Sequence, residues 1–387
     1  MSEASKTPSV ETSVESSESS IKLPVVKNPL ERKKVLEFTL ENTNVSIANA
    51  LRRTILSDIP TVVFDTNHEE FTITTNTTRF NNEILKQRLG CIPIHIKDPT
   101  VINDLLIELN ETNEKESLEY ITTKNFKIKN IQSQTYLKEA TTKKIFPSNK
   151  LTQCYILFVR LRPQISNDIP GETIQLSSRV RVATAREDGM YNVVSTCAYG
   201  NTPDRVEQEA QWEPIADALQ KKGATGKEID YQRQNWYTLE GKRYYIDDSF
   251  DFKIESVGVY SNTEIIIKAC DILINKLNKI KQASAEKTLD LNKEATAMKN
   301  CVDIKLVGED YTIGKVIEYI LHYDYYLQEQ VLSYVGFIKF HPHDDYSIIR
   351  MAYSDDDLFN NANIYDMIGY VCETGINIFT NLKEYFV

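Results

Sequence analysis

The sequence feature that most constrains this fold is residues 42–65, which predict a capped helix followed by a buried strand. Apolar residues recur at three- and four-residue steps and give the helix one apolar face; they are Ala48, Leu51, Ile55 and Ile59. Oxygens that can cap its first turn precede that face, at Asn42, Thr43, Asn44 and Ser46. Pro60 ends the helix, because its ring clashes with the preceding turn and it lacks an N–H. Residues 61–64 are β-branched or aromatic, so we expect a strand there.

Two arginines, Arg52 and Arg53, lie off the apolar face of this helix, with Asn49 beside them. Composition alone favours a solvated surface pair. The alternative is a partner-binding site carried on a rigid element. The order of residues 49–60, Asn-Ala-Leu-Arg-Arg-Thr-Ile-Leu-Ser-Asp-Ile-Pro, favours that alternative. It closely resembles the signature of the α-like subunits of cellular RNA polymerases, which include bacterial α, archaeal D and the third-largest subunit of RNA polymerase II. The resemblance implies a helix in a dimer core whose arginines face the large subunits.

A second signature follows at residues 76–94. Its pattern predicts a loop, a short helix over residues 82–89, Gly90 at the C′ position of that helix, and a strand. The ending Arg-Leu-Gly-Cys-Ile-Pro resembles the second motif of the same family, and Arg88 matches the arginine of that motif. The resemblance therefore implies four residues that bind the large polymerase subunits: Asn49, Arg52, Arg53 and Arg88.

The second half of the chain repeats the first without an insertion. Thr312 lies over Ser46 and Asp324 over Asp58 at the same offset (312 − 46 = 266 and 324 − 58 = 266). Two runs, residues 308–314 and 336–342, resemble the eleventh subunit of RNA polymerase II, the small partner of the α-like heterodimer. The chain thus resembles both partners fused, as in polymerases of some large DNA viruses. The implied dimer core comprises Ala48, Leu51, Ile55, Ile313 and Ile317.

These resemblances imply an α+β fold, in which two α-like dimerisation units form an intramolecular pseudo-dimer and an inserted domain interrupts the first. The expected divisions are a disordered tail (1–32), a first dimerisation domain (33–66 and 245–280), an inserted domain (67–244), a linker or helical extension (281–300) and a second dimerisation domain (301–387). The tail prediction rests on composition, since a Ser-, Thr- and Glu-rich segment buries too little apolar surface to offset its conformational entropy. Within the insertion we expect an exposed loop at 108–119. We also expect a helix at 203–222, with an inner face of Trp212, Ile215, Ala218 and Leu219.

Composition argues against several other classes of protein. The net charge of −10 does not suit a surface that mainly binds phosphates, and no apolar run has membrane-spanning length. Six scattered cysteines without a Cys-x-x-Cys motif support neither a disulfide framework nor a zinc site. Many relatives hold zinc or an iron–sulfur cluster in the inserted domain, but only Cys154 and Cys197 lie in residues 100–244, so we expect no metal and no cofactor. The residues at 341–345, His-Pro-His-Asp-Asp, could ligate a metal, but the family pattern explains them as a turn.

The resemblance implies a non-catalytic assembly platform of a DNA-directed RNA polymerase. Its expected partners are the largest and second-largest subunits and small polymerase subunits, with DNA bound only through the complex, no membrane, and one copy per polymerase. The expected location is the virion and the cytoplasmic viral factory if the chain is viral, and otherwise the nucleus. Two alternatives stay open: a regulatory binding module that uses the same dimer fold outside a polymerase, and an enzyme housed in the insertion, for which we find no catalytic motif. In the assembly hypothesis, reversing the charge of both Arg52 and Arg53 blocks assembly and leaves the fold intact.

Overall fold

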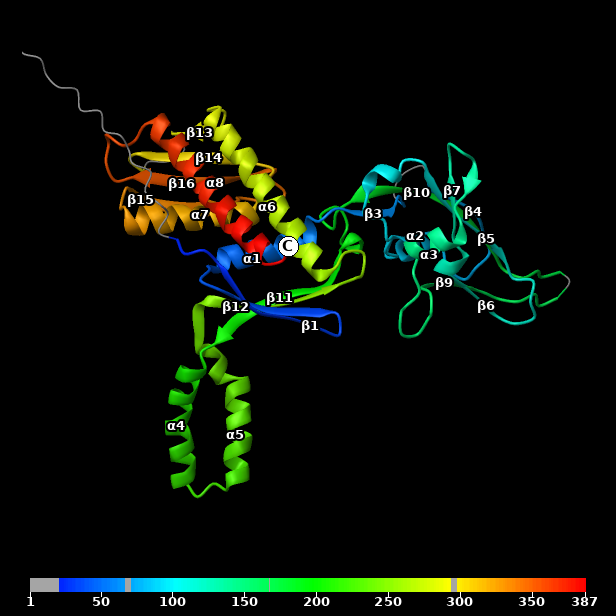
Figure 1. The fold of residues 1–387 in the computed structure, drawn as a ribbon, viewed down its shortest axis with the longest axis horizontal. Helices are drawn as coiled ribbons and strands as arrows, with labels where there is room; N and C mark the ends of the chain where they lie inside the picture. The colour runs from blue at the N-terminus through cyan, green and yellow to red at the C-terminus, as the bar shows by residue number, and fades with distance from the viewer. Residues whose placement is uncertain (1–20, 67–70, 167, 294–297) are drawn as a thin grey trace, which may run out of the picture.

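The fold is organised around helix α1 (Val45–Ser57), which lies near the centre of the molecule (Figure 1). The computed structural model describes residues 21–66, 71–166, 168–293 and 298–387. Asn44 caps α1, because its Oδ1 accepts a hydrogen bond from the N–H of Ser46 at 2.9 Å. Ala48, Leu51 and Ile55 of the predicted apolar face are buried in α1. The helix ends at Ser57, three residues before Pro60, so Ile59 is buried but lies outside it. Strand β3 (Thr61–Phe64) follows Pro60 as predicted.

The first four-stranded sheet packs against α1. Its order is β1 (Val25–Arg32), β2 (Val35–Glu41), β12 (Tyr245–Ser256) and β11 (Val194–Pro203), and every neighbouring pair is antiparallel. Helix α6 (Asn262–Ala285) follows β12 and buries one face in the same core. The prediction of a tail over residues 1–32 was wrong for 25–32, which form β1. Backbone pairing with β2 holds this strand although only Val26 of it is buried, whereas residues 1–20 lie outside the described residues.

The second four-stranded sheet has the same strand order as the first. It runs β13 (Asp290–Asn292), β14 (Cys301–Val307), β16 (Tyr346–Tyr353) and β15 (Leu332–Ile338), again antiparallel. The offset of 266 residues relates β2 to β14. Leu36 of β2 pairs with Ile254 of β12, and the equivalent residue of β14, Val302, pairs with Met351 of β16. Helix α7 (Tyr311–Ile320) continues as a π-helix (Leu321–Gln328), and α8 (Asn361–Glu384) ends the chain. Helix α1 packs on α7, and α6 runs along α8, so one buried apolar cluster spans both sheets.

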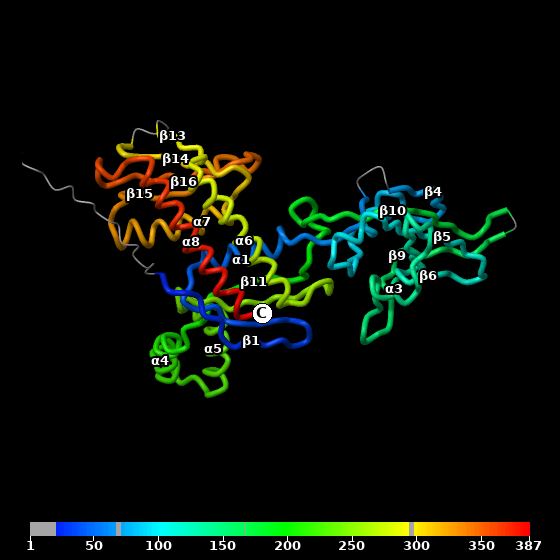
Figure 2. The backbone as a smooth tube through the Cα atoms, turned by 45° about the horizontal axis from the view of Figure 1, so that its top comes forward, coloured from blue at the N-terminus to red at the C-terminus, as the bar shows by residue number. Residues whose placement is uncertain are grey.

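The residues between α1 and β11 form a separate body on one side of the molecule (Figures 1 and 2). Its main sheet has the order β3, β10 (Thr173–Ala183), β5 (Leu105–Thr112), β7 (Lys127–Asn130) and β8 (Thr135–Tyr136), and β4 (Phe71–Asn76) also pairs with β10. A small sheet of β6 (Glu119–Thr122) and β9 (Leu157–Leu161) and the helices α2 (Asn82–Gly90) and α3 (Glu139–Ile145) complete it around its own apolar core. Short 3₁₀ helices occur at Pro99–Val101, Thr123–Asn125, Gly189–Tyr191 and Glu240–Arg243.

Strand pairing places the limits of this body differently from the predicted insertion at 67–244. Strand β3 pairs with β10 and belongs to the body, whereas β11 pairs with β12 and belongs to the first sheet. Part of the predicted loop at 108–119 was also wrong, because residues 105–112 form the central strand β5. In the segment 281–300, predicted as a linker or helical extension, the helix α6 continues to Ala285, and residues 290–292 add the edge strand β13 to the second sheet.

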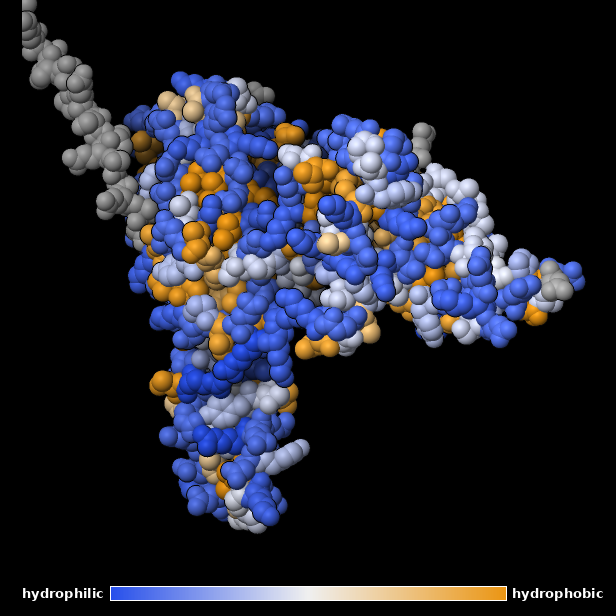
Figure 3. All heavy atoms as spheres, turned by 45° about the vertical axis from the view of Figure 1, so that its right-hand side comes forward, coloured by the Kyte–Doolittle hydropathy of each residue, from blue (hydrophilic) through white to orange (hydrophobic). Residues whose placement is uncertain are grey.

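Two helices, α4 (Arg205–Lys221) and α5 (Gly226–Thr238), connect β11 to β12 and extend from the first sheet as a hairpin with a mostly hydrophilic surface (Figures 1 and 3). Trp212 packs on Trp236 with ring centroids 5.8 Å apart, and only Trp212 of the four predicted inner residues is buried. Ile215 and Ala218 are exposed and Leu219 is half-buried, so that predicted apolar face was wrong.

Gly90 corrects a second local prediction. It lies inside α2, where Cys91 is the C-cap, and no strand follows at residues 92–94. A Cβ on Gly90 would lie 2.4 Å from the Sδ of Met190, one hundred residues away. Close packing, and not a left-handed C′ conformation, is therefore the reason for glycine at this position.

Gly314 brings together two of the runs that carry the resemblance. It lies in α7, and a Cβ there would stand 1.9 Å from Cε2 of Phe337 on β15. Because the ring is held between α7 and its sheet, we expect Gly314→Ala to lower the free energy of unfolding by about 1–3 kcal/mol. Urea denaturation measures this change. Gly369→Ala in α8 is the matched control, since a Cβ there meets nothing within 4 Å and should raise stability by about 0.5–1 kcal/mol. Equal effects of the two substitutions would contradict the packing argument.

Candidate functional site

Arg52 and Asn49 form a polar pair on the partly exposed face of α1. Both the Nε and the Nη2 of Arg52 donate to Oδ1 of Asn49, at 3.1 and 2.9 Å. Among the residues that the structure describes, Arg52 has no carboxylate partner, although its charge acts on Cys197 and Tyr199 of β11. Asn49 thus orients the guanidinium group, and one edge of its planar fork stays available for an external acceptor.

Arg53 points in a different direction from Arg52, toward the start of helix α7. Its Nε donates to Oγ1 of Thr312 at 3.0 Å, and its Nη2 lies 3.2 Å from Oδ2 of Asp310. Both partners belong to the N-terminal end of α7. The structure therefore uses Arg53 within the chain, and its assignment to a large polymerase subunit stays a prediction.

Arg53 is one member of a group of charged residues that we call the charged joint: Arg53, Asp58, Arg186, Lys276, Glu309 and Asp310. Asp58, the C-cap of α1, has its side chain only 6% exposed and binds Arg186 and Lys276, each at 2.8 Å. Arg186 follows β10 and also lies 3.4 Å from Asp310, while its N–H donates to the Ser57 carbonyl at 2.9 Å. Lys276 of α6 also lies 3.4 Å from Glu309. Three cations and three anions thus join α1, α6, the segment after β10 and the start of α7.

Burial and neighbouring charges act in opposite directions on the acids of the charged joint. Burial opposes ionisation of Asp310, but hydrogen bonds from Thr312 and the charges of Arg53 and Arg186 outweigh it and lower its pKa to about 2. Burial likewise opposes ionisation of Asp58, and Lys276, Ser57 and Arg186 still lower its pKa. At Glu309 burial dominates and raises the pKa, despite Lys276. The joint therefore favours ionisation of Asp58 and Asp310 and disfavours that of Glu309.

These shifts predict an acid-sensitive joint. A carboxyl whose pKa is lower in the folded state stabilises the fold above its unfolded pKa, and this stability is lost as pH falls through the folded pKa. A decrease of the Asp310 pKa from 3.8 to about 2 corresponds to about 2 kcal/mol of folding stability. We expect Asp310→Asn to be less stable than the native chain by about this amount at pH 7, and the difference to shrink between pH 4 and pH 2. Urea midpoints at several pH values measure it. Asp290→Asn, at an exposed aspartate, is the control, and a pH-independent difference would contradict the assignment.

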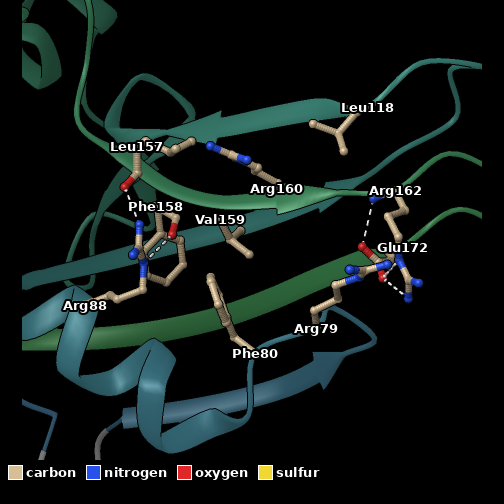
Figure 4. Close-up of a pocket in the computed structure, with 10 residues that line it drawn as sticks. All are labelled: Arg79, Phe80, Arg88, Leu118, Leu157, Phe158, Val159, Arg160, Arg162 and Glu172. Atoms are coloured by element: carbon tan, nitrogen blue, oxygen red, sulfur yellow. Dashed lines mark hydrogen bonds and ion pairs between the residues drawn. The ribbon is translucent and has the colours of Figure 1, made fainter.

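Arg88 lies in the separate body, at one wall of a cavity of about 530 Å³ (Figure 4). Its Nε and Nη2 donate to the carbonyl oxygens of Phe158 and Leu157, at 2.7 and 2.9 Å, and its guanidinium stacks on Phe80 at 5.4 Å. These bonds fix α2 against β9. The cavity is lined by Arg79, Phe80, Arg88, Leu118, Leu157, Phe158, Val159, Arg160, Arg162 and Glu172. The charged group of Arg88 thus holds the backbone of its own body, and its assignment to a large polymerase subunit stays a prediction.

The structure places the predicted dimer-core residues at the contact between α1 and α7. Each of the five is at most 1% exposed and belongs to the apolar cluster that spans both sheets: Ala48, Leu51, Ile55, Ile313 and Ile317. Sequence reasoning missed Arg186 and Lys276 in the charged joint, because Asp58, the acid that both of them bind, is more than one hundred residues away from each. Asp310 lies in the run 308–314 that resembles the eleventh subunit, but its position before α7 does not indicate that it pairs with Arg53.

The described part of the chain contains neither a group of metal ligands nor a helix that could span a membrane. Across residues 21–66, 71–166, 168–293 and 298–387, no three His, Cys, Asp or Glu side chains are placed to share a metal ion. The same residues contain no helix that combines the length and the apolar character needed to cross a bilayer. The predicted turn at His341 is confirmed: it joins β15 to β16, and the His341 N–H donates to Asp344 at 3.0 Å.

Comparison with known proteins agrees with this geometry. The family described as the RNA polymerase Rpb3/Rpb11 dimerisation domain matches residues 37–277, which include α1, the separate body and most of α6. The chain is 22% identical to subunit 3B of the DNA-directed RNA polymerases IV and V of Arabidopsis thaliana, over 67% of this chain and 91% of that protein. It is 25% identical to the RNA polymerase II subunit RPB3 of Schizosaccharomyces pombe, over 63% and 82%. It is 26% identical to the RNA polymerase I and III subunit rpac1 of Dictyostelium discoideum, over 64% and 78%. The chain therefore belongs to the Rpb3/Rpb11 family, the α-like, non-catalytic assembly subunits of multisubunit DNA-directed RNA polymerases.

Proposed function

We propose that this chain is a fused α-like platform, in which residues 301–387 act as the small Rpb11-type partner of the residues before them. The two sheets share one strand order, and the offset of 266 residues runs through β2, α1, β14 and α7. Two chains of the α-like heterodimer would thus be replaced by one intramolecular pseudo-dimer, with the body between α1 and β11 as the inserted domain. The single observation that carries this proposal is the burial of α1 against α7 in one continuous core.

In this proposal the platform binds the two largest polymerase subunits. Arg52, oriented by Asn49, is the residue that we assign to that contact, because it is half-buried, cationic and without a carboxylate partner in the described part of the chain. Arg53 and Arg88 support the contact from inside the chain, by holding α7 and β9 in place. The position equivalent to Arg52 in the second unit is Glu318, so only one side of the pseudo-dimer offers this basic contact and the large subunits dock in one orientation.

The fusion of both units resembles the polymerases of some large DNA viruses. The chain would then work in the virion and in the cytoplasmic viral factory, and otherwise in the nucleus. The alternative function, a regulatory binding module outside a polymerase, is supported by the dimer fold alone. The Arg-Arg pair and the Arg-Leu-Gly-Cys-Ile-Pro run disfavour it, since a dimer fold does not require them.

Affinity purification of the tagged full-length chain from its native source tests the proposal. We expect two very large polymerase subunits at equal stoichiometry, with one copy of this chain per complex. Two copies per complex would mean that the halves pair between chains and would overturn the fused platform. Recovery of the chain without large subunits would favour the regulatory module. Quantitative mass spectrometry with isotope-labelled reference peptides gives the copy number.

A further inference from the structure

The contact between α1 and α7 has two equivalent ends that the sequence fills differently. The internal repeat relates the two ends, because each is formed by the middle of one helix and the residues before the other. One end is the charged joint. The other is a pocket of about 290 Å³, which we call the tyrosine pocket; it is lined by Lys22, Asn42, Thr43, Asn44, Asp247, Asp248, Tyr319 and Tyr323.

A residue-by-residue comparison shows what the tyrosine pocket lacks. With the offset of 266 residues, Tyr319 stands where Arg53 stands in the charged joint, and Asn44 stands where Asp310 stands. In the described part of the chain no guanidinium group takes the place of Arg186, because α7 continues directly into the π-helix and β15, whereas the chain after α1 passes through the separate body. The charged joint therefore contains a guanidinium group brought in by a third segment, and the equivalent position at the tyrosine pocket is a hollow.

Several polar groups around the tyrosine pocket lack partners. Thr43 is 6% exposed, and its buried Oγ1 has no hydrogen-bond partner. Within residues 21–66, 71–166, 168–293 and 298–387, the carboxylates of Asp247 and Asp248 form no ion pair and the hydroxyls of Tyr319 and Tyr323 form no hydrogen bond. The two tyrosine rings lie with centroids 6.1 Å apart. Burial, together with Tyr323, Asp324 and Asp248, raises the pKa of Tyr319 to about 12, so its hydroxyl remains a neutral donor and acceptor.

This combination of groups selects a particular kind of occupant. Two carboxylates in the lining attract a cation, and two tyrosine rings favour a flat, weakly hydrated one. Lys22 at the rim leaves the lining with a net negative charge, since it opposes two aspartates. We propose that the tyrosine pocket receives an arginine side chain from a separate protein chain, as the charged joint receives Arg186 from its own chain. The inference rests on the proposed function in one respect: that separate chain is a polymerase subunit.

Charge also argues against the chain's own N-terminal residues as the occupant. Residues 1–20 immediately precede the part of the chain that contributes Lys22, and they contain four glutamates and one lysine. A segment of that composition carries the same sign of charge as Asp247 and Asp248. A separate, basic partner segment therefore fits the pocket better.

The first test uses the purified full-length chain and the probe Nα-acetyl-arginine amide. Tyrosine rings are labelled with ¹³C, and Tyr319→Phe and Tyr323→Phe assign their two signals. We expect saturable shifts of both signals, and an affinity at least fivefold lower for the citrulline analogue, which keeps the shape of arginine without its charge. Asp248→Asn should weaken arginine binding about fivefold, the effect of one partly exposed ion pair of about 1 kcal/mol. Asp290→Asn, an exposed aspartate on β13, should change nothing. Equal binding of both probes, or no shift, would overturn the proposal.

The second test identifies the natural occupant. A photoreactive benzoylphenylalanine replaces Lys22, which lies at the rim and is neither a tyrosine nor an acid of the pocket. In the purified polymerase we expect a cross-link to an arginine-containing segment of another subunit. A cross-link confined to this chain, or stronger probe binding after deletion of residues 1–20, would assign the pocket to the chain's own N-terminal segment and overturn the proposal. Failure to recover any polymerase would instead contradict the proposed function, while the arginine titration would still decide the chemistry of the pocket.

Discussion

Asp58→Ala should lower the free energy of unfolding by about 3 kcal/mol, the largest effect that we expect from a single substitution in this chain. The side chain of Asp58 is 6% exposed and binds Lys276 and Arg186, which come from distant parts of the sequence. Removing one partner from a buried ion pair leaves its cations without compensation, at a typical cost of 3–5 kcal/mol. The lower limit applies, because the side chain of Arg186 is 46% exposed and water can solvate it.

Urea denaturation at pH 7 measures this change. Glu139→Ala is the matched control, since Glu139 also pairs with a lysine but its side chain is 75% exposed, so no measurable change in stability is expected. A loss below 1 kcal/mol at Asp58 would mean that the charged joint contributes little and that apolar packing alone holds the two units together. Restoring the carboxylate at a longer reach, as in Asp58→Glu, should recover part of the stability.

The charged joint also changes the interpretation of the paired arginines. From the sequence, reversing Arg52 and Arg53 together was expected to leave the fold intact. The structure contradicts that expectation for Arg53, because a glutamate there would face Asp310 across the contact between the units. The double variant would confuse a loss of assembly with a loss of stability, so the two arginines must be tested separately.

Local patterns in the sequence were sufficient for most of the helices and strands. The capped start of helix α1 and the strand after Pro60 depend on neighbouring residues, and the structure confirms them. The internal repeat was visible because both halves place the same residue types at a constant offset, and the shared strand order agrees with it. Strand β1 was missed because its stability comes from backbone pairing with β2, and a strand with one buried residue leaves no apolar alternation to detect.

The candidate site was less predictable, because its contacts join residues that are far apart in the sequence. Arg53 and Asp310 are separated by 257 positions, and nothing in either neighbourhood indicates the other. Gly90 illustrates the same limit. Its sequence context suggests a helix stop, whereas the side chain of Met190, one hundred residues away, occupies the space that a side chain at position 90 would need. Sequence patterns indicate which residues are unusual, and only the packing of distant segments decides whether they face a partner chain or their own.

Arg52→Glu should strongly weaken binding of the large polymerase subunits and change the stability of the isolated chain little. Within the part of the chain that the structure describes, its guanidinium bonds only to Asn49, so the loss of that bond should change the free energy of unfolding by less than about 1 kcal/mol. A glutamate in place of a guanidinium that pairs with a partner's acceptor costs at least about 2 kcal/mol of binding, which is roughly a thirtyfold loss of affinity. Co-purification with the large subunits, alongside urea denaturation of the free chain, measures both quantities.

A graded series makes the assignment of Arg52 specific. Arg52→Lys keeps the charge and loses the planar fork, so we expect an intermediate loss of assembly. Asn49→Ala should weaken assembly less than Arg52→Glu, because Asn49 only orients the guanidinium. Arg243→Glu is the control for charge reversal, since that side chain is 76% exposed on the helical hairpin and should have no effect on the large subunits. If Arg52→Glu assembles as well as Arg243→Glu, the contact lies elsewhere on the platform, and the arginine pair is a feature of the fold and not of docking.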